Sequence, residues 1–424
     1  MPISTSRWNN WTRRWARRGL ASFVAGAAAA CGQAPPLTPA AEPELRIGLV
    51  AGAAAVSLGG DGDLAVIDDL NGTPIGTIPA GTVWRVVADT PGVRLLRPDG
   101  TALAGHRGLS AVSLSSDRFL VANGHRYRGR VHVLRDPAGL TLLNRLPLES
   151  YLAGVITGEL GARRAEERAA LLAQAVVSRT YALKNRGRWE GQGFDAWADT
   201  RDQVYTGVGG ETREAWDALG ATHGEVLRYH GDLIDAYFHS TCGFRTAGVE
   251  EAFAAAQPRP YLRPVSDAGP GGRDYCAISP HYRWHEEWDG TTLRAILSRT
   301  LPALMHTGGR ELERVADLEV TRPSRSGRVG ELRIVFEHGE VRVPEADVRA
   351  VLRPRPDQLL GSAAFQLSVT KDSGQVTRVV AAGAGWGHGV GLCQWGAVGR
   401  ARAGQDYRTI LTTYFPGTTL ERLY

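Results

Sequence analysis

The sequence predicts a mixed α+β fold, and three observations support this. Residues 45–145 contain short runs in which apolar residues alternate with polar ones, as in half-buried strands. Residues 146–186 carry two segments with apolar residues at helical spacing. Strand-like runs return between residues 313 and 382. The order of strands, helices, loops and strands indicates an α+β protein.

The first 31 residues are typical of an export signal. Arg13, Arg14, Arg17 and Arg18 precede the apolar run GLASFVAGAAAAC, which ends at Cys31. A cysteine directly after small residues resembles the lipidation site of a bacterial lipoprotein, although Ala28 stands where leucine is usual. Plain secretion is the alternative. Residues 32–44 are rich in proline and predict an extended linker.

The charge of the chain changes when this signal is set aside. The formal net charge is +5 and the isoelectric point is about 9.1. Residues 1–31 hold five arginines and no acidic residue, so the remaining chain is formally neutral. The basic character therefore does not indicate a nucleic-acid-binding surface. No apolar run of spanning length follows residue 40, so we expect membrane contact only through a lipid at Cys31.

The N-terminal β-rich domain is expected over residues 45–145. The segments LRIGLV, TVWRVV and RGRVHVL predict strands, and NGT and PDG predict turns between them. We expect this domain to pack or position the rest of the protein. The remaining residues, 146–424, are expected to form the chemistry-bearing core.

Two helices begin this core. The first starts near Pro147 and ends at Gly161, and the second covers residues 165–186. Residues 187–300 predict loops with short elements. Strands are expected within residues 313–343 and 362–382, and a short helix near the C-terminus.

The first helix carries a carboxylate at each end. Glu149 lies in the first turn, where the helix dipole stabilises an anion, and is expected to be a helix-start residue. Glu159 lies in the last turn among apolar neighbours, where both the dipole and burial raise the pKa of a carboxyl group. A protonated carboxyl group near neutral pH suits general acid chemistry. A surface glutamate before a helix end is the alternative from position alone.

Many ordered motifs resemble one family. LPLESYLAGVITGELG and AQAVVSRTYAL are followed by DTRDQVYTG, YFHSTCGFRT, YLRPVSD, YCAISPHYRW, SRSGRVGELRI, GWGHGVGLCQWGA and YFPGTTL. Together these motifs resemble the stage II sporulation protein D family, which includes a sporulation lytic transglycosylase and the amidase enhancers. The resemblance covers roughly residues 45–424.

The resemblance implies a protein directed at peptidoglycan. It implies a lytic transglycosylase that cleaves between N-acetylmuramic acid and N-acetylglucosamine in glycan without stem peptides, with Glu159 as general acid and base. Glu159 would lie on a helical hairpin packed against a β-rich core. Gly158, Leu160 and Gly161 depart from the family's usual neighbours of this glutamate. Two other functions stay open: an amidase enhancer that stimulates a partner amidase, and an inactive wall anchor.

Several polar and aromatic residues are candidates for the sugar groove. Aromatic rings with a few fixed polar groups suit carbohydrate surfaces. In the second helix, structural and substrate roles are equally open for Gln174, Arg179 and Tyr181. Loop architecture is the alternative for Gln203, Tyr205, Ser240 and Thr241. His388 and Gln394 are candidates to orient Glu159 or the muramic sugar, and Trp386 is a candidate to stack on the sugar or pack. The glycines of GWGHGVGLCQWGA are expected to allow positive φ angles and close backbone approach.

Three cysteines remain after Cys31, and an odd number leaves a thiol unpaired or indicates a metal. Zinc is the cofactor that fits Cys242, Cys276 and Cys393 together with His239 or His388. A disulfide between Cys242 and Cys276, buried thiols and a cysteine nucleophile beside a histidine are the alternatives. Some members of the family bind zinc through a loop after the second helix. This chain has neither cysteine nor histidine from Lys184 to Thr222, which puts that particular site in doubt.

Overall fold

The computed structural model describes residues 41–103, 105–305 and 314–424. These residues form helices and several sheets, which confirms a mixed α and β fold. The expected signal, the lipidation site at Cys31 and most of the linker lie outside the described residues. Within the described residues, every helix is too short or too polar to cross a membrane.

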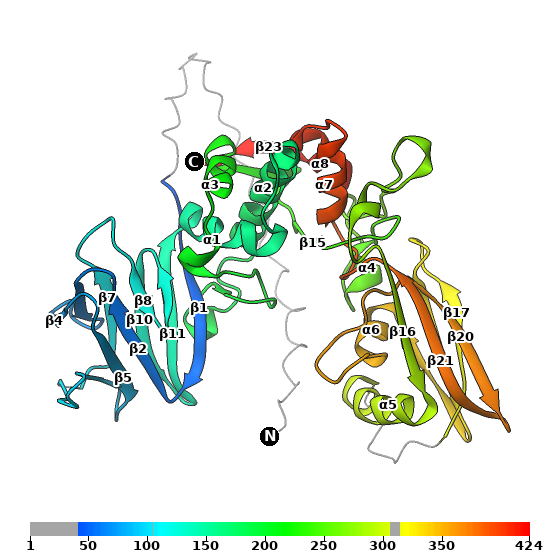
Figure 1. The fold of residues 1–424 in the computed structure, drawn as a ribbon, viewed down its shortest axis with the longest axis horizontal. Helices are drawn as coiled ribbons and strands as arrows, with labels where there is room; N and C mark the ends of the chain where they lie inside the picture. The colour runs from blue at the N-terminus through cyan, green and yellow to red at the C-terminus, as the bar shows by residue number, and fades with distance from the viewer. Residues whose placement is uncertain (1–40, 104, 306–313) are drawn as a thin grey trace, which may run out of the picture. The chain divides into compact units, whose positions relative to one another are not determined.

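Residues 44–147 are built from strands (Figure 1). The strands are β1 (Glu44–Ala53), β2 (Ala55–Gly60), β3 (Leu64–Asp68), β4 (Pro74–Ile78), β5 (Val83–Ala88), β6 (Val93–Leu96), β7 (Gly108–Ser113), β8 (Leu120–Ala122), β9 (His125–Tyr127), β10 (Arg130–Asp136) and β11 (Gly139–Pro147). A seven-stranded sheet has the order β12-β1-β11-β10-β7-β3-β4, where β12 is Ala196–Trp197. A five-stranded sheet has the order β6-β5-β2-β8-β9. The strands expected at residues 45–50, 82–87 and 128–134 are confirmed by β1, β5 and β10.

The N-terminal strands share a core with the helices that follow them. β1 pairs with β11 in antiparallel register, and β12 joins the free edge of β1 in parallel. Leu45 and Ile47 of β1 are fully buried in the same apolar cluster as Tyr151 of the first helix. β11 also runs without a loop into that helix at Pro147. The strands therefore fix the start of the helix that bears Glu159.

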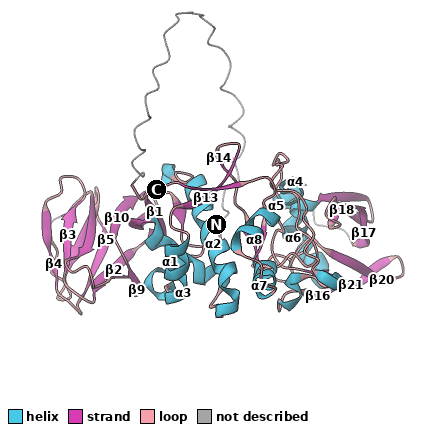
Figure 2. Ribbon diagram, turned by 90° about the horizontal axis from the view of Figure 1, so that it is seen from above, coloured by secondary structure: helices cyan, strands magenta, loops and turns pink. Residues whose placement is uncertain are grey.

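The helices of the first core follow these strands in the chain, and α1 lies beside them (Figure 2). They are α1 (Leu148–Leu160), η1 (Ala165–Glu167), α2 (Arg168–Lys184), η2 (Glu190–Gln192), η3 (Gly207–Gly210), α3 (Arg213–Ala221), α4 (Val249–Ala252), α7 (Gln394–Arg402) and α8 (Tyr407–Tyr414). The two helices expected after residue 146 are confirmed by α1 and α2. α7 begins inside the glycine-rich motif, where a bent backbone was expected.

Short strands connect distant parts of this core. β13 (Glu225–Tyr229) lies between β14 (Asp232–Leu233) and the C-terminal β23 (Thr419–Arg422). β15 (Phe238–His239) pairs in parallel with β22 (Leu392–Cys393), so the FHSTCG motif lies against the GLCQWG motif. The turns η4 (Pro270–Gly272) and η5 (Tyr275–Ile278) follow, and η5 packs against α7.

Residues 283–384 form a second, separate apolar core. Its sheets have the orders β16-β21-β20 and β17-β18-β19. The strands are β16 (Arg283–Asp289), β17 (Val315–Pro323), β18 (Val329–Phe336), β19 (Gly339–Pro344), β20 (Phe365–Asp372) and β21 (Gln375–Ala384). Two helices, α5 (Gly290–Met305) and α6 (Glu345–Val351), lie beside these strands (Figure 1). Apolar residues from Trp288 to Ala381 make this core.

The sequence missed α5, because residues up to 300 were expected to hold only short elements. Its start is nevertheless marked: Asp289 accepts a hydrogen bond from the main chain of Thr292, as residues before a helix do. Leu293, Leu297 and Leu301 recur at helical spacing and are fully buried. The strands expected within residues 313–343 and 362–382 are confirmed by β17 to β21.

Candidate functional site

Glu159 lies in the last turn of α1. Pro147 precedes the helix with φ −56°, and Gly161 ends it with φ +73° while its N–H donates to the carbonyl of Thr157. The left-handed conformation at Gly161 suits glycine, since it has no Cβ. The apolar face of the helix, with Tyr151 and Ile156, is completely buried. This anchoring holds the Glu159 side chain at a defined place at the helix end.

The carboxylate of Glu159 is partly buried and weakly solvated. Its Oε1 accepts a hydrogen bond of 2.8 Å from the main-chain N–H of Val204. Burial raises the pKa of Glu159, and the hydrogen bond from Val204 offsets only part of that effect. Among the described residues, no basic side chain forms an ion pair with it. This is the environment that favours a protonated carboxyl group.

Two glycines of α1 allow the segment around Val204 to come this close. A Cβ on Gly158 would lie 2.9 Å from the carbonyl oxygen of Val204, and one on Gly154 would lie 2.7 Å from the ring of Tyr205. Residues four apart share one face of a helix. The glycines at 154 and 158 therefore form a flat strip on α1 against which residues 204–207 pack. The Gly158 that departs from the family's pattern thus has a steric reason.

Gln203 and Tyr205 are interior residues of this segment. The hydroxyl of Tyr151 donates to Oε1 of Gln203 at 3.3 Å, and the hydroxyl of Tyr205 donates to Oδ1 of Asn144 at 2.8 Å. The Gln203 amide nitrogen is buried and has no hydrogen-bond partner among the described residues. A buried amide without a partner is rare, so Gln203 keeps an unused donor beside the residue that holds Glu159.

α7 reaches the same end of α1. The amide nitrogen of Gln394 donates to the carbonyl oxygen of Glu159 at 3.2 Å and contacts Oε1 of Gln174 at 3.4 Å. Gln174 in turn donates to the hydroxyl of Ser178 at 3.0 Å and is completely buried. Gln174 and Gln394 therefore connect α1, α2 and α7, and the contacts of Gln174 are internal.

Arg179 also makes internal contacts only. Its Nε and Nη2 donate to the two carboxylate oxygens of Glu149 at 2.8 and 2.7 Å, and its Nη1 donates to the carbonyl of Glu225. The side chain is completely buried. Although burial opposes ionisation of Glu149, the arginine lowers the pKa of this carboxyl group. Of the two roles that the sequence left open for Arg179, the geometry supports the structural one.

The remaining candidates for the sugar groove are spread around this centre. Tyr181 is mostly buried, with its hydroxyl 3.5 Å from Asp202, and Thr241 is buried with its hydroxyl 2.7 Å from that of Ser279. Ser240 is partly buried, and its carbonyl accepts from the main chain of Trp395. Trp386 is partly buried, with its ring 4.7 Å from that of His281.

Two further residues at the helix end were missed from the sequence. The guanidinium of Arg163 lies 4.9 Å from the ring of Trp395, and both residues are partly buried. Arg163 follows the helix end at Gly161, and Trp395 follows Gln394. Arg163 also pairs with Glu167 at 3.8 Å. An aromatic ring and a cation after the end of the helix that bears Glu159 are the kind of groups that line a carbohydrate site. The sequence offered a signal for both: Trp395 lies within the motif GWGHGVGLCQWGA, and Arg163 lies two residues after the motif LPLESYLAGVITGELG.

His239 and His388 make hydrogen bonds to main-chain groups. His388 donates from Nε2 to the carbonyl of Phe238 and accepts at Nδ1 from the main chain of Val390. Both of its ring nitrogens are therefore used. His239 bonds through Nδ1 to the carbonyl of Val390, and burial lowers its pKa to about 3. Neither histidine belongs to the metal-ligand group found among the described residues.

Cys242, Cys276 and Cys393 do come together, and Asp267 completes the group. One ligand atom from each of these four residues lies within 4.8 Å of the others. All three cysteines are free thiols, and the Sγ atoms of Cys242 and Cys276 are 3.6 Å apart. The sequence missed Asp267 because a single aspartate in a loop carries no local signal of metal binding.

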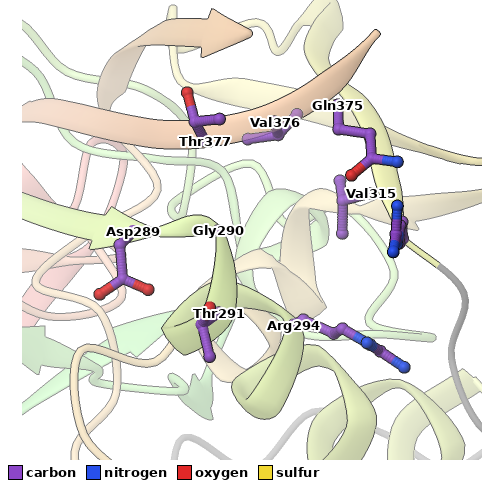
Figure 3. A pocket seen from close by; sticks show the side chains of 9 residues that line it. Asp289, Gly290, Thr291, Arg294, Val315, Gln375, Val376 and Thr377 are labelled. Atoms are coloured by element: carbon purple, nitrogen blue, oxygen red, sulfur yellow. The ribbon is translucent and has the colours of Figure 1, made fainter. Parts of the chain in front are cut away.

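A surface pocket of about 420 Å³ is lined by residues of the segment that forms the second core (Figure 3). Its lining includes Asp289, Thr291, Gln375 and Thr377. These residues come from the last residue of β16, the start of α5 and the start of β21. Glu159 does not line this pocket. The chemistry indicated by the environment of Glu159 therefore belongs to the first core.

Two family models match separate parts of the chain. Residues 137–229, which include α1, α2 and Gln203, match the family model described as Stage II sporulation protein. Residues 272–391, which enclose the second core, match a model described as a domain of unknown function.

Alignments with three relatives each cover more than half of this chain. An uncharacterized protein of Brachyspira hyodysenteriae is 31% identical over 302 residues, covering 70% of this chain and 73% of the relative. Stage II sporulation protein D of Bacillus subtilis is 24% identical over 341 residues, covering 74% of this chain and 88% of the relative. The amidase enhancer of Bacillus subtilis is 27% identical over 295 residues, covering 63% of this chain and 40% of the relative. The chain belongs to the stage II sporulation protein D family.

Proposed function

We propose that the protein is a lytic transglycosylase that cleaves the bond between N-acetylmuramic acid and N-acetylglucosamine in peptidoglycan. The observation that carries this proposal is the environment of Glu159. Its carboxyl group is held at a helix end by one main-chain hydrogen bond, and burial raises its pKa. Such a group can donate a proton near neutral pH and take one back.

The reaction needs a single acid and base. Ordinary glycosidases use two carboxyl groups, one of which activates water or acts as nucleophile. In a lytic transglycosylase the C6 hydroxyl of the muramic sugar attacks its own C1 instead. Glu159 protonates the leaving glycosidic oxygen and then accepts the proton of the C6 hydroxyl, so one residue serves both steps. The product is a 1,6-anhydro-muramic end.

Arg163 and Trp395 are the side chains that we expect to bind the glycan beside Glu159. Both are partly buried at the same end of α1, so each keeps an accessible face. A tryptophan ring packs against the apolar face of a sugar, and a guanidinium binds hydroxyl or carboxylate oxygens. Gln394 and Gln174 are positioning residues in this proposal, because Gln394 contacts the end of α1 and Gln174 contacts Gln394.

The test uses purified protein and glycan strands without stem peptides. Mass spectrometry should show 1,6-anhydro-muramic ends, and Glu159→Gln should reduce their rate of formation by roughly 10²–10⁴-fold. The amide can still accept the hydrogen bond from Val204, so the fold should be retained. Glu166→Gln is the matched control. Glu166 lies in η1 and has an exposed side chain, so this substitution should leave the rate unchanged. No anhydro ends from folded wild-type protein would refute the enzyme proposal.

The second candidate function is stimulation of a cell-wall amidase, and the similarity to the Bacillus subtilis amidase enhancer favours it. The two functions differ in their dependence on Glu159. If the protein is an enhancer, the wild type and Glu159→Gln should bind peptidoglycan equally well. Both should also raise the rate of an added amidase to the same extent.

We also propose that the protein acts outside the cytoplasm, attached through a lipid on Cys31. The relatives named for sporulation and amidase enhancement support an exported protein. Fractionation of cells that express wild type and Cys31→Ser tests this proposal. The wild type should be recovered with membranes, and the variant should not.

A further inference from the structure

Four side chains converge from three distant parts of the chain in the interior of the first core. Cys242 lies shortly after β15, Asp267 and Cys276 lie before and within η5, and Cys393 ends β22. All four are completely buried. Their ligand atoms lie within 4.8 Å of one another. We propose that Cys242, Asp267, Cys276 and Cys393 bind one structural zinc ion.

The spacing of the ligand atoms fits zinc better than a disulfide. A disulfide brings two sulfur atoms to about 2.05 Å, whereas Cys242 and Cys276 are 3.6 Å apart. In a tetrahedral site with zinc–sulfur bonds of about 2.3 Å, neighbouring sulfur atoms lie about 3.8 Å apart. A disulfide would also leave the Cys393 sulfur unused among the four groups. A metal ion uses all four groups.

The surroundings of Cys393 favour a thiolate. Its sulfur accepts hydrogen bonds from the main-chain N–H groups of Cys242 at 3.1 Å and Gly396 at 3.2 Å. Cys393 is also the residue that caps the N-terminus of α7, where the helix dipole stabilises negative charge. Metals bind the thiolate form of cysteine, so these contacts prepare a ligand.

The carboxylate of Asp267 is oriented by its neighbours, as metal ligands usually are. Its Oδ2 accepts from the main chain of Cys276 at 2.8 Å, and its Oδ1 accepts from the hydroxyl of Tyr414 at 2.5 Å. Gly396 leaves room for this arrangement, since a Cβ there would lie 2.7 Å from Oδ1 of Asp267. Each oxygen keeps a further lone pair for a cation.

Two buried arginines balance the charge of such a site. Three thiolates and a carboxylate around a divalent ion leave a negative site. Arg400 lies 3.7 Å from Oδ1 of Asp267, and Arg328 donates from Nη2 to the carbonyl of Cys242 at 3.0 Å. Arg328 is buried, and its Nε and Nη1 have no hydrogen-bond partner among the described residues. A buried cation of this kind is stabilised by nearby anions. Glu345 and Glu251 act on Arg328 in this way, and the proposed zinc–thiolate site would add to them.

The role of the ion follows from the segments that it joins. With four protein ligands the site has no open position for substrate, which is typical of structural zinc. The ion would fasten the loop after β15 and the segment of η5 to the start of α7. Cys393 directly precedes Gln394, which contacts the end of α1. Zinc would therefore hold α7 at the place where it meets the helix of Glu159, whatever reaction occurs there.

The first experiment measures metal in the full-length protein. After incubation with excess zinc and gel filtration, elemental analysis should find one zinc per chain. X-ray absorption should find three sulfur atoms at about 2.3 Å and one oxygen at about 2.0 Å. Folded protein without metal, a disulfide between any two of the three cysteines, or an imidazole nitrogen in the zinc shell would each overturn the proposal.

Variants identify the ligands. Cys276→Ala and Asp267→Asn should each weaken zinc binding by at least ~10-fold. The loss of a residue that only supports a ligand already costs ~10-fold or more in metal affinity, and these residues are proposed as direct ligands. Cys31→Ala is the matched control, because it removes the chain's remaining cysteine and should keep one zinc per chain. The absorption spectrum of the wild type with cobalt in place of zinc gives a readout that does not depend on the folding of variants. Sulfur-to-cobalt charge-transfer bands are expected, and their absence from cobalt-loaded protein would contradict thiolate ligation.

Discussion

The amide of Gln394 donates a hydrogen bond of 3.2 Å to the main-chain carbonyl of Glu159, although 235 residues separate them. The bond joins the first turn of α7 to the last turn of α1. Carbonyl groups in the last turn of a helix have no partner within the helix, so an external donor stabilises the helix end. The same glutamine contacts Gln174 on α2. Gln394 is thus where the three helices around the candidate acid meet.

Gln394→Ala should lower the free energy of unfolding by about 1–3 kcal/mol. The substitution leaves the Glu159 carbonyl and the Gln174 side chain without this donor in a mostly buried place. Urea denaturation measures the change. Gln366→Ala is the control, since Gln366 is exposed on β20 and its loss should cost less than about 0.5 kcal/mol. Equal effects of the two variants would show that the contacts of Gln394 do not stabilise the fold.

The free energy of unfolding should depend on pH through the ionisation of Glu159. Burial raises the pKa of this carboxyl group above its value in the unfolded chain. Between the two pKa values the folded state binds more protons than the unfolded state, so the contribution of Glu159 to stability is lost as pH rises. Glu159→Gln cannot ionise. Its stability relative to wild type should therefore increase with pH, by at most about 1.4 kcal/mol per unit, starting near the ordinary glutamate pKa.

Urea denaturation of both proteins at several pH values checks this prediction. The difference should level off once Glu159 is ionised in the folded state as well. A stability difference that does not change with pH would mean that the pKa of Glu159 is not raised. The same shift predicts that transglycosylase activity persists above the ordinary glutamate pKa and falls as the folded protein loses this proton.

Arg179→Met should destabilise the protein by about 3–5 kcal/mol, because it leaves the carboxylate of Glu149 buried without its cation. The double variant with Glu149→Gln should recover part of this loss, since no buried charge then remains. Arg378→Met is the matched control. Arg378 also binds a carboxylate through two nitrogens, that of Glu287, but this pair is about half exposed and should contribute about 0–1 kcal/mol. Denaturation midpoints of the wild type, Arg179→Met, the double variant and Arg378→Met test this prediction.

Gly391→Ala should be far more harmful than Gly404→Ala. Both glycines have positive φ, +74° and +81°, which costs alanine about 1–2 kcal/mol. At Gly391 a Cβ would also collide with the carbonyl oxygen of Tyr237, whereas at Gly404 no atom lies within 4 Å. We expect a further loss of about 1–3 kcal/mol at Gly391 from this overlap. Thermal denaturation compares the two. Similar melting temperatures would show that the β15–β22 contact can yield without cost.

The local signals of the sequence determined much of the secondary structure. Pro147 and Gly161 bounded α1, because proline suits a helix start and glycine suits the left-handed residue after a helix. Alternating apolar residues located β1, β5 and β10. The position of Glu159 in the last helical turn, together with its apolar neighbours, predicted the raised pKa. These features depend on residues within a few positions of one another.

Other features depend on contacts that no local pattern records. Arg179 and Gln174 were open between structural and substrate roles until the packing of α1, α2 and α7 showed their internal partners. Asp267 joined the three cysteines only because β15 pairs with β22 and η5 packs on α7. The glycine-rich motif was expected to bend, and it does so at Gly391, but it also starts α7 at Gln394. The sequence alone determined which residues carry reactive groups, and the tertiary structure decided which of them meet. Burial and pairing arise from segments that are hundreds of residues apart.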